Sequence, residues 1–398
     1  MRLTFIGILL FFGVQATVAQ DTLLSDSTKR VNCAQAQLFL QHYRFEAALG
    51  ALNACFEQDT SNTEYLRKKA LCYYKLGRFQ EAEATYYAIL ETDSNNVNAL
   101  NQLGVIYSNQ SNYRAAVEQY ERLSAIDTAN SYYHKVLGSL FYKLKVIDYA
   151  MGHDQLALEL NPNDVEAIAH LTKIYQSMEQ YELADELIVK GLELDSSNAT
   201  LYHYQLKSAY RQHNYAGVLG SAQYLMQLEQ DTSAYLLKMM GIAHFHTGDY
   251  ALSASLLEKV VDNDKAKEQL HYYIGLAYRE MGDAETSEKH FEQAIENGIS
   301  DNISIYYTNL AIAFEEQGNY AEAIRAYQMA YKSSQNKILL YHLARNYDAY
   351  YGDKETALRY YEKYLEANDT GNVRFKDYSK HRISEIKEVI HFDIDTLR

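Results

Sequence analysis

The strongest constraint on the fold is a pattern of 34 residues that recurs along the chain and is clearest in residues 304–337. Apolar or aromatic residues fall in two sets there, one before and one after Gly318: Tyr307, Leu310, Ala311 and Phe314, then Tyr320, Ala323, Tyr327 and Ala330. Each set has the spacing of a helix with one buried stripe, and Gly318 lies where the first helix must end. Two short antiparallel helices cannot bury their apolar face alone, so the unit requires neighbours.

The same spacing fits ten times. The units are 29–62, 63–96, 97–130, 131–164, 165–198, 199–232, 234–267, 268–301, 304–337 and 338–371, with Ser233 and residues 302–303 inserted. Position 20 of the unit carries Ala48, Ala82, Ala116, Ala150, Ala184, Val218, Ser253, Ser287, Ala323 and Ala357. Position 8 is mostly small as well, with Ala36, Ala70, Gly104, Gly138, Thr172, Gly241, Gly275 and Ala311.

This pattern predicts how the helices pack. Small residues at positions 8 and 20 are expected to let the two helices of a unit approach closely. The larger residues at positions 4, 7, 11, 24 and 27 are expected to fill the space between units. The chain has one Pro in 398 residues, and with few strand-like runs this composition favours an all-helical fold.

The spacing and the pattern resemble the tetratricopeptide repeat, a helix–turn–helix unit of 34 residues. The resemblance covers residues 29–371. It implies an all-α fold, a right-handed superhelical solenoid of antiparallel helix pairs with a concave groove lined by the first helices. Because each unit touches only its neighbours, the ten units are interpreted as one elongated array.

The chain departs from the family pattern in several places. It has no Trp, which the family carries at position 4, and the proline of position 32 occurs once, as Pro162. Ser takes this place in residues 93–96 and 195–198, where its side-chain oxygen is expected to cap the next helix. Units 199–232 and 338–371 are expected to be irregular, because large residues replace the small ones at their packing positions: Leu206, Val218 and Arg345.

The two ends of the chain do not repeat. Residues 1–19 combine one positive charge with about twelve mostly apolar residues, which is typical of a secretory signal peptide cut after Ala19, with an uncleaved anchor as the alternative. Residues 20–28 then form a linker. The protein is therefore expected to be exported and periplasmic, with outer-membrane association or secretion as alternatives. Residues 372–398 have the apolar spacing of an amphipathic helix that caps the array, and its basic side could contact a membrane surface or a partner.

Three cysteines, Cys33, Cys55 and Cys72, all lie near the start of the mature chain. Export permits a disulfide, and Cys33 and Cys55 lie on the two helices of the first unit. Packing of the three thiols as small apolar side chains is the favoured interpretation, with the disulfide as the alternative.

No motif for catalysis or for a metal is present. The chain lacks a Gly-rich phosphate loop, a GlyXaaSerXaaGly elbow, HisGluXaaXaaHis and paired CysXaaXaaCys, and His244 and His246 are spaced to point to different sides of a helix. We therefore expect no enzyme, no metal and no cofactor. A formal net charge of −15 disfavours a nucleic-acid partner.

The resemblance assigns positions 2, 5, 9 and 12 of the first helices to the groove. Basic residues at these positions include Arg67, Lys135, Lys173, Lys207, Lys238 and Arg279, and acidic ones include Glu166 and Glu315. Aromatic residues there are Tyr74, Tyr132, Tyr142, Tyr210, Tyr235, Phe245 and Tyr272. A basic, aromatic groove suits an extended peptide that carries acidic residues or a free carboxylate. The Lys-and-Asn clamp that some relatives use for a C-terminal carboxylate is not matched position by position.

Two functions of different classes follow. The first is a protein interaction scaffold of the bacterial cell envelope that binds an acidic or carboxylate-bearing peptide in this groove, without a transmembrane segment in the mature chain. The second is a carrier or recruiting module for an anionic glycan or another envelope component. Peptide binding that weakens with salt would favour the first.

Overall fold

The computed structural model describes residues 31–55, 62–229, 233–265, 267–298, 301–367 and 372–396. The expected signal peptide (1–19) and linker (20–28) lie outside these residues. The described part is all-helical and contains no strand, which confirms the predicted fold class. The chain divides into two compact units, Met1–Ser196 (unit 1) and Ser197–Arg398 (unit 2). Each is described by itself; "repeat" below denotes one 34-residue segment.

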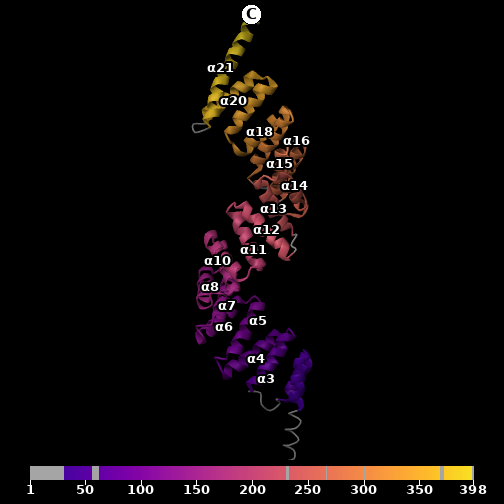
Figure 1. Cartoon of the computed structure of the whole chain (residues 1–398), viewed down its shortest axis with the longest axis vertical. Helices are drawn as coiled ribbons and strands as arrows, with labels where there is room; N and C mark the ends of the chain where they lie inside the picture. The colour runs from indigo at the N-terminus through magenta and orange to yellow at the C-terminus, as the bar shows by residue number, and fades with distance from the viewer. Residues whose placement is uncertain are drawn as a thin grey trace, which may run out of the picture. The chain divides into compact units, whose positions relative to one another are not determined.

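Unit 1 is a series of helix pairs in which each helix packs against the next (Figure 1). Its first helix covers residues 31–41. The following helices are α2 (Phe45–Cys55), α3 (Thr63–Lys75), α4 (Phe79–Thr92), α5 (Val97–Asn109), α6 (Tyr113–Ile126), α7 (Ser131–Lys143), α8 (Ile147–Leu160), α9 (Val165–Ser177) and α10 (Tyr181–Leu194). In unit 1, therefore, α3, α5, α7 and α9 are the first helices of their repeats.

Unit 2 continues with the same pairing but includes short irregular helices. Its elements are α11 (Ala199–Arg211), α12 (Tyr215–Glu229), α13 (Ala234–Thr247), α14 (Tyr250–Glu258), the 3₁₀ helix η1 (Val261–Asn263), α15 (Lys267–Glu280), α16 (Ala284–Glu296), α17 (Ile303–Glu316), α18 (Tyr320–Ser334), α19 (Ile338–Asn346), the π-helix η2 (Tyr347–Tyr351), α20 (Lys354–Ala367) and α21 (Val373–Thr396). The repeat at 199–232 has first and second helices of ordinary length. The π-helix lies in the repeat at 338–371 and lengthens its first helix.

The turn inside each repeat has one backbone feature in common. Residue 15 of the repeat is left-handed in all ten, with φ between 57° and 88°: Tyr43, Gly77, Ser111, Lys145, Glu179, His213, Gly248, Gly282, Gly318 and Gly352. A single residue in this conformation ends the first helix and reverses the chain. Glycine adopts it without a steric penalty, so Gly318 ends its helix as the sequence predicts.

The helix starts are capped by a different residue from the one expected. The caps are the last residues of the preceding repeat, Asn62, Asn96, Asn130, Asp164 and Asn198, whose side-chain oxygens accept hydrogen bonds from backbone N–H groups two or three residues later. The prediction that Ser at position 32 provides the cap is therefore wrong. Position 34 precedes the first helical residue directly, which is where a side-chain oxygen can reach the free N–H groups.

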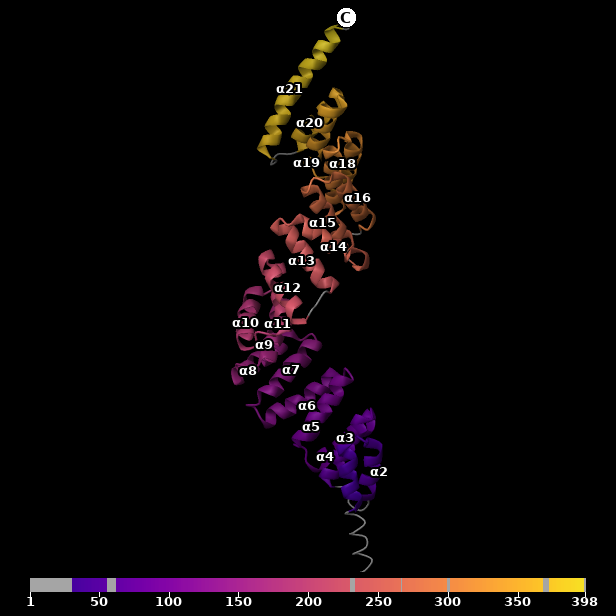
Figure 2. The same ribbon diagram turned by 45° about the vertical axis from the view of Figure 1, so that its right-hand side comes forward.

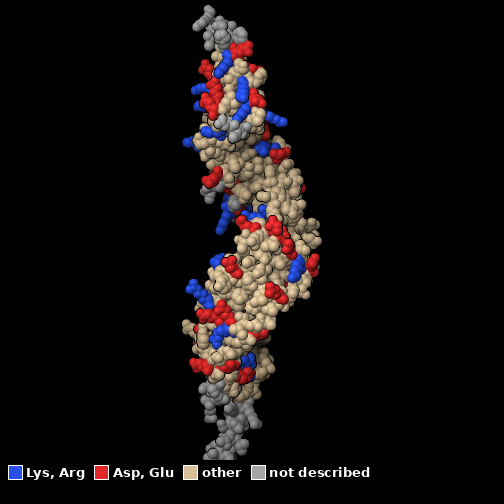
Figure 3. All heavy atoms as spheres, turned by 90° about the vertical axis from the view of Figure 1, so that its left-hand side faces the viewer, with Lys and Arg blue, Asp and Glu red and all other residues tan. Residues whose placement is uncertain are grey.

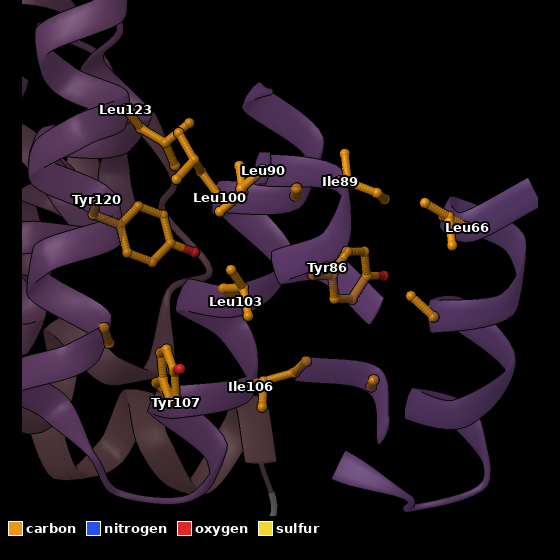
Figure 4. Close-up of a cluster of buried hydrophobic side chains, with 14 of the residues drawn as sticks. Leu66, Tyr86, Ile89, Leu90, Leu100, Leu103, Ile106, Tyr107, Tyr120 and Leu123 are labelled. Atoms are coloured by element: carbon orange, nitrogen blue, oxygen red, sulfur yellow. The ribbon is translucent and has the colours of Figure 1, made fainter. Parts of the chain in front are cut away.

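The core of each repeat depends on a close contact between its two helices. All ten residues at position 20 are 0% exposed. A Cβ added to Gly104 on α5 would lie 2.5 Å from the ring of Tyr120, at position 24 of the same repeat. Figure 4 shows this ring pointing from α6 towards Leu103 on α5. Gly241 and Gly275 lie in the same way under Leu257 and Phe291. Position 24 thus packs against position 8 within a repeat, rather than only between repeats as expected.

A disulfide joins Cys33 and Cys55 across the first helix pair, with their Cα atoms 5.0 Å apart. This corrects the interpretation of these two residues as packing thiols. Cys72 remains a free, buried thiol, and burial raises its pKa to about 11. The disulfide is consistent with an oxidising compartment.

The long helix α21 packs along α20 at the end of unit 2 (Figure 2). Its Phe375 ring stacks on Tyr341 with centroids 4.3 Å apart. Arg382 donates to both oxygens of the buried Asp348, at 2.5 and 3.0 Å, and Lys354 donates to the same carboxylate at 2.6 Å. Burial raises the pKa of Asp348, but these hydrogen bonds outweigh it and hold the pKa below its usual value. The carboxylate therefore fastens α21 to the last repeat.

Replacing Gly104 with alanine tests the contact between the helices. The new methyl group would overlap the Tyr120 ring, and overpacking of this kind costs about 1–3 kcal/mol, more than the gain of about 1 kcal/mol in helix propensity. We expect Gly104→Ala to lower the free energy of unfolding in urea. Gly152 on α8 has no atom within 4 Å of its added Cβ, so Gly152→Ala is the matched control and should be neutral or stabilising. Equal effects of the two variants would contradict the packing role of position 8.

Replacing Arg382 with alanine tests how α21 is attached. Asp348 would lose two charged hydrogen bonds, each worth about 1.5–3 kcal/mol, and we expect hydrogen exchange to speed up across residues 373–396 but not in unit 1. Lys387 on the same helix pairs with Glu362 at 2.8 Å, with 56% and 40% of the side chains exposed. Such surface pairs contribute about 1 kcal/mol or less, so Lys387→Ala should leave exchange almost unchanged.

Candidate functional site

A hollow of about 340 Å³ lies on the side of unit 1 formed by the first helices. It is lined by Tyr113, Ser139, Tyr142, Lys143, Lys145, His170 and Lys173. Below, "the lysine pocket" means this hollow. It contains two of the predicted groove residues, Tyr142 and Lys173.

Helical spacing explains why these side chains meet. On α7, Ser139, Tyr142 and Lys143 are three and four residues apart, and on α9 His170 and Lys173 are three apart, so each set lies on one face of its helix. Lys145 is the left-handed turn residue after α7 (φ 64°). Tyr113 is the first residue of α6.

Three of the pocket residues are lysines, and each lies close to a tyrosine ring. Lys173 Nζ lies 4.6 Å from the centroid of the Tyr142 ring, and Lys145 Nζ lies 5.6 Å from it. Lys143 Nζ lies 5.2 Å from the Tyr113 ring. Among the described residues, no carboxylate oxygen lies within the 4.0 Å ion-pair limit of these three amino groups. The rings stabilise the cations by cation–π contacts.

The His170 imidazole forms a hydrogen bond with the buried carboxylate of Asp154 on α8. His170 Nδ1 lies 2.6 Å from Asp154 Oδ2, and Asp154 is 0% exposed. While Asp154 is ionised its carboxylate only accepts hydrogen bonds, so in that state Nδ1 carries the shared proton and Nε2 is the ring nitrogen without a partner. The Tyr142 ring contacts the imidazole edge-on, with centroids 5.8 Å apart.

Asp154 is the only charged residue at position 24. The other nine repeats have Leu52, Tyr86, Tyr120, Ile188, Ala222, Leu257, Phe291, Tyr327 and Tyr361, all buried. Gly138 makes room for the carboxylate: an added Cβ would lie 2.1 Å from Oδ1, and this oxygen has no hydrogen-bond partner. Burial raises the pKa of Asp154, and the hydrogen bond with His170 lowers it in part. A buried carboxylate that is only partly paired destabilises a helix contact.

The pocket also contains a hydroxyl group, that of Ser139. Ser139 lies in the same hollow as the His170–Asp154 pair, but no hydrogen bond joins its hydroxyl to the imidazole in the described structure. A serine nucleophile needs its base within hydrogen-bond reach. The pocket thus combines three lysines, one histidine, one serine and two tyrosines.

A second hollow, of about 580 Å³, lies at the other end of α7. It is lined by Val97, Asn98, Asn101, Asn130, Tyr132 and Tyr133. The side-chain oxygen of Asn101 is buried without a hydrogen-bond partner. Tyr132 is 45% exposed. Tyr132 and Tyr142 are ten residues apart on α7, which is about 15 Å at a rise of 1.5 Å per residue.

The other predicted groove cations of unit 1 are paired. Arg67 donates to both oxygens of Glu64 at 2.9 Å. Lys135 Nζ lies 3.0 Å from Asp164 and 2.7 Å from Glu166. The Tyr74 hydroxyl accepts a hydrogen bond from Asn109 at 2.9 Å. These residues therefore add little free charge to the first-helix side.

In unit 2 the predicted groove residues do not form a comparable cluster. Lys238 pairs with Asp264 at 2.8 Å, and Arg279 donates to Asn309 at 2.6 Å and to Glu280 at 3.3 Å. Lys207 is exposed, with no ion pair to a described carboxylate. The aromatic residues Tyr210, Phe245 and Tyr272 pack against the hydrophobic core of unit 2.

Sequence reasoning missed six residues of the pocket and its support. One of them, Ser139, lies at position 9 but is neither basic nor aromatic. Positions 2, 5, 9 and 12 do not include Tyr113, Lys143, Lys145, His170 or Asp154. The signal available was Asp154, because a charged residue at an otherwise apolar or aromatic position of a repeat is visible by alignment of the ten units. On the face shown in Figure 3, basic and acidic side chains are interspersed.

Two further properties of the described residues concern metal sites and membrane-spanning helices. They contain no group of three or more His, Cys, Asp or Glu side chains that could hold a metal ion. None of their helices combines the length and the apolar character needed to cross a membrane.

Replacing Asp154 with leucine tests whether the carboxylate is present at the expense of stability. Leu257 already occupies this position over Gly241, and replacing a buried ion pair with an apolar residue often adds about 1–4 kcal/mol. We expect Asp154→Leu to raise the free energy of unfolding, and Asp148→Leu, on the exposed side of the same helix, not to do so.

The increase in the free energy of unfolding caused by Asp154→Leu should depend on pH. Because the pKa of Asp154 is raised in the native state, its contribution is most favourable in acid and declines as pH rises through the native pKa. The difference between Asp154→Leu and the wild type should therefore be larger at pH 7 than at pH 4. A difference that shrinks as pH rises would contradict the burial argument.

Comparison with known proteins supports the repeat assignment. Three family models, each described as a tetratricopeptide repeat, match residues 33–97, 76–140 and 268–336. No protein with a curated description is similar enough in sequence to match.

Several solved structures have a similar arrangement of helices. A tetratricopeptide repeat protein from Parabacteroides merdae is 20% identical, covers 63% of this chain and 98% of its own, and has a TM-score of 0.45. MamA from Desulfovibrio magneticus is 20% identical, with 43% and 97% covered and a TM-score of 0.40. YrrB, described as having an unusual peptide-binding site, is 18% identical, with 47% and 94% covered and a TM-score of 0.41. These scores are too low to bear on the ligand of this chain.

Repeats of this family form extended surfaces that generally serve as non-catalytic scaffolds for protein–protein interaction. With the helix pairs of both units and the matches over residues 33–140 and 268–336, this chain contains tetratricopeptide repeats.

Proposed function

We propose that the protein is a non-enzymatic scaffold of the bacterial cell envelope whose unit 1 binds an extended acidic peptide, with one carboxylate of the peptide held in the lysine pocket. The observation that carries the proposal is the set of three lysines without acidic partners, Lys143, Lys145 and Lys173, beside two tyrosine rings. Hydrogen bonds from ammonium groups to a carboxylate are about twice as strong as neutral ones. Tyrosine adds apolar contact area that suits a protein interface.

The second hollow supports an extended ligand. Asn98 and Asn101 on α5 present side-chain amides that can both donate to and accept from a peptide main chain. The distance of about 15 Å along α7 between Tyr132 and Tyr142 corresponds to four or five residues of extended chain at about 3.3 Å each. A peptide of this length could occupy both hollows.

The envelope location rests on the sequence of residues 1–19, which predicts a cleaved signal peptide. N-terminal sequencing of the protein purified from the periplasmic fraction would test it. A chain that begins at Gln20 is the expected result, and a chain that retains Met1 in the cytoplasmic fraction would contradict it.

Reversing the charge of one pocket lysine tests the proposed function. The probe is an acetylated, amidated decapeptide of alternating Glu and Gly, and the measurement is isothermal titration calorimetry at low salt. Because a hydrogen bond to a charged group is worth about 1.5–3 kcal/mol, Lys173→Glu should weaken binding by about tenfold or more. Lys190 is an exposed lysine on α10, and Lys190→Glu makes the same change in charge away from the pocket.

The outcomes separate the candidate ligands. A loss of affinity in Lys173→Glu but not in Lys190→Glu supports the pocket. Equal losses would mean that only net charge matters and would contradict it. If an anionic polysaccharide displaces the peptide at a far lower concentration than a second peptide does, the carrier function replaces the scaffold.

A further inference from the structure

We propose that the lysine pocket takes up a proton together with its carboxylate ligand, and that His170 carries this proton on Nε2 while the buried Asp154 holds Nδ1–H. The inference rests on the proposed function for the identity of the ligand, and adds how the same site is regulated. It predicts that acidic peptides bind more tightly as pH falls.

The geometry leaves His170 one free nitrogen. Nδ1 lies 2.6 Å from Asp154 Oδ2, so the tautomer is set by a carboxylate that cannot donate when ionised. His170 is 18% exposed and lines the pocket. In the neutral ring, Nε2 presents a lone pair, which repels an anion. In the protonated ring, Nε2–H becomes a fourth donor beside the three ammonium groups.

The charges around the imidazole make its protonation depend on the ligand. The titratable groups facing it are Asp154 from α8, Tyr142 and Lys143 from α7, Tyr113 from α6, Lys145 from the following turn, and Lys173 from α9 itself. The structure shows no hydrogen bond or ion pair from α10 to this ring. Three lysines oppose a further positive charge there, and the carboxylates of Asp154 and, one helical turn away on α9, Glu166 favour it. A bound carboxylate offsets the lysines, so the imidazolium becomes favourable.

Linkage gives the size of the effect. If one proton is taken up on binding, the affinity changes by up to about tenfold per pH unit, and it rises as pH falls. Histidine is the side chain whose charge changes between about pH 5 and 8. The carboxylates of an acidic peptide stay ionised over most of this range, because their usual pKa is about 4.

A structural role for Asp154 alone would explain the pair without any change in binding. A salt bridge that only positions α8 against α9 predicts altered stability in its variants but the same dependence of affinity on pH. A second imidazole pair, His134 and His153, also lies between α7 and α8, with Nδ1 atoms 3.2 Å apart. The test therefore compares variants at His170 and Asp154, in which that second pair stays intact.

The experiment is calorimetry of the full mature chain with the Glu/Gly decapeptide at pH 7 in two buffers of different ionisation enthalpy, HEPES and Tris. The difference in observed heat gives the number of protons taken up. The wild type should take up a measurable fraction of a proton, and its affinity should fall by about tenfold between pH 6 and pH 8. His170→Gln, which stays neutral, should take up none and fall by less than about threefold. Asp154→Asn, which keeps the hydrogen-bond acceptor without the charge, should reduce the uptake.

Two probes distinguish the sources of the carboxylate. The amidated peptide offers only side-chain carboxylates, and a decapeptide of Gly and Asn with a free C-terminus offers only the terminal one. Proton uptake with either supports the inference and names the source. Lysine-dependent binding without proton uptake, or with the same uptake in His170→Gln, overturns the inference and leaves the proposed function intact. No binding of either peptide to the wild type overturns both.

Discussion

The close approach of the two helices within a repeat is the contact on which the rest of this structure depends. A small residue at position 8 receives the buried side chain of position 24, as Gly104 receives Tyr120 (Figure 4). A left-handed residue at position 15 returns the chain so that the two positions meet. When this contact is repeated, the first helices of neighbouring repeats line up on one side, and that side becomes the surface available to a ligand.

The lysine pocket lies at the one repeat in which position 24 carries a charged residue. Asp154 takes the place of an apolar or aromatic side chain, and Gly138 provides the space for it. The carboxylate then reaches the imidazole of His170 on the next helix from beneath the surface. The carboxylate packs less favourably than an apolar side chain, but its hydrogen bond fixes the orientation of the His170 imidazole in the pocket that the three lysines line. The same substitution at an exposed position would leave the imidazole unrestrained.

Counting the lysines and arginines at the groove positions overstates the positive charge of the first-helix side, because several of them form ion pairs. Asp164 caps α9 through its side chain and also lies 3.0 Å from Lys135. The capping residue of one repeat therefore neutralises a groove lysine of the previous first helix. Arg67 is neutralised within its own helix by Glu64. Lys143, Lys145 and Lys173 are not neutralised in this way, because they lie towards the C-terminal ends of α7 and α9, away from the capping residues.

The sequence by itself determined the all-helical class, the 34-residue unit and the small residues of the helix contact, because these are periodic and depend on local spacing. The family resemblance also assigned Tyr142 and Lys173 to the side of the first helices, and both line the lysine pocket. Only the tertiary structure decided which charges remain free, that Asn and Asp at position 34 cap the helices, and that Cys33 pairs with Cys55. It also brought Asp154 under His170 across sixteen residues of sequence. These outcomes depend on distances between side chains of different helices, and a periodic pattern carries no information about such distances until the helices are packed.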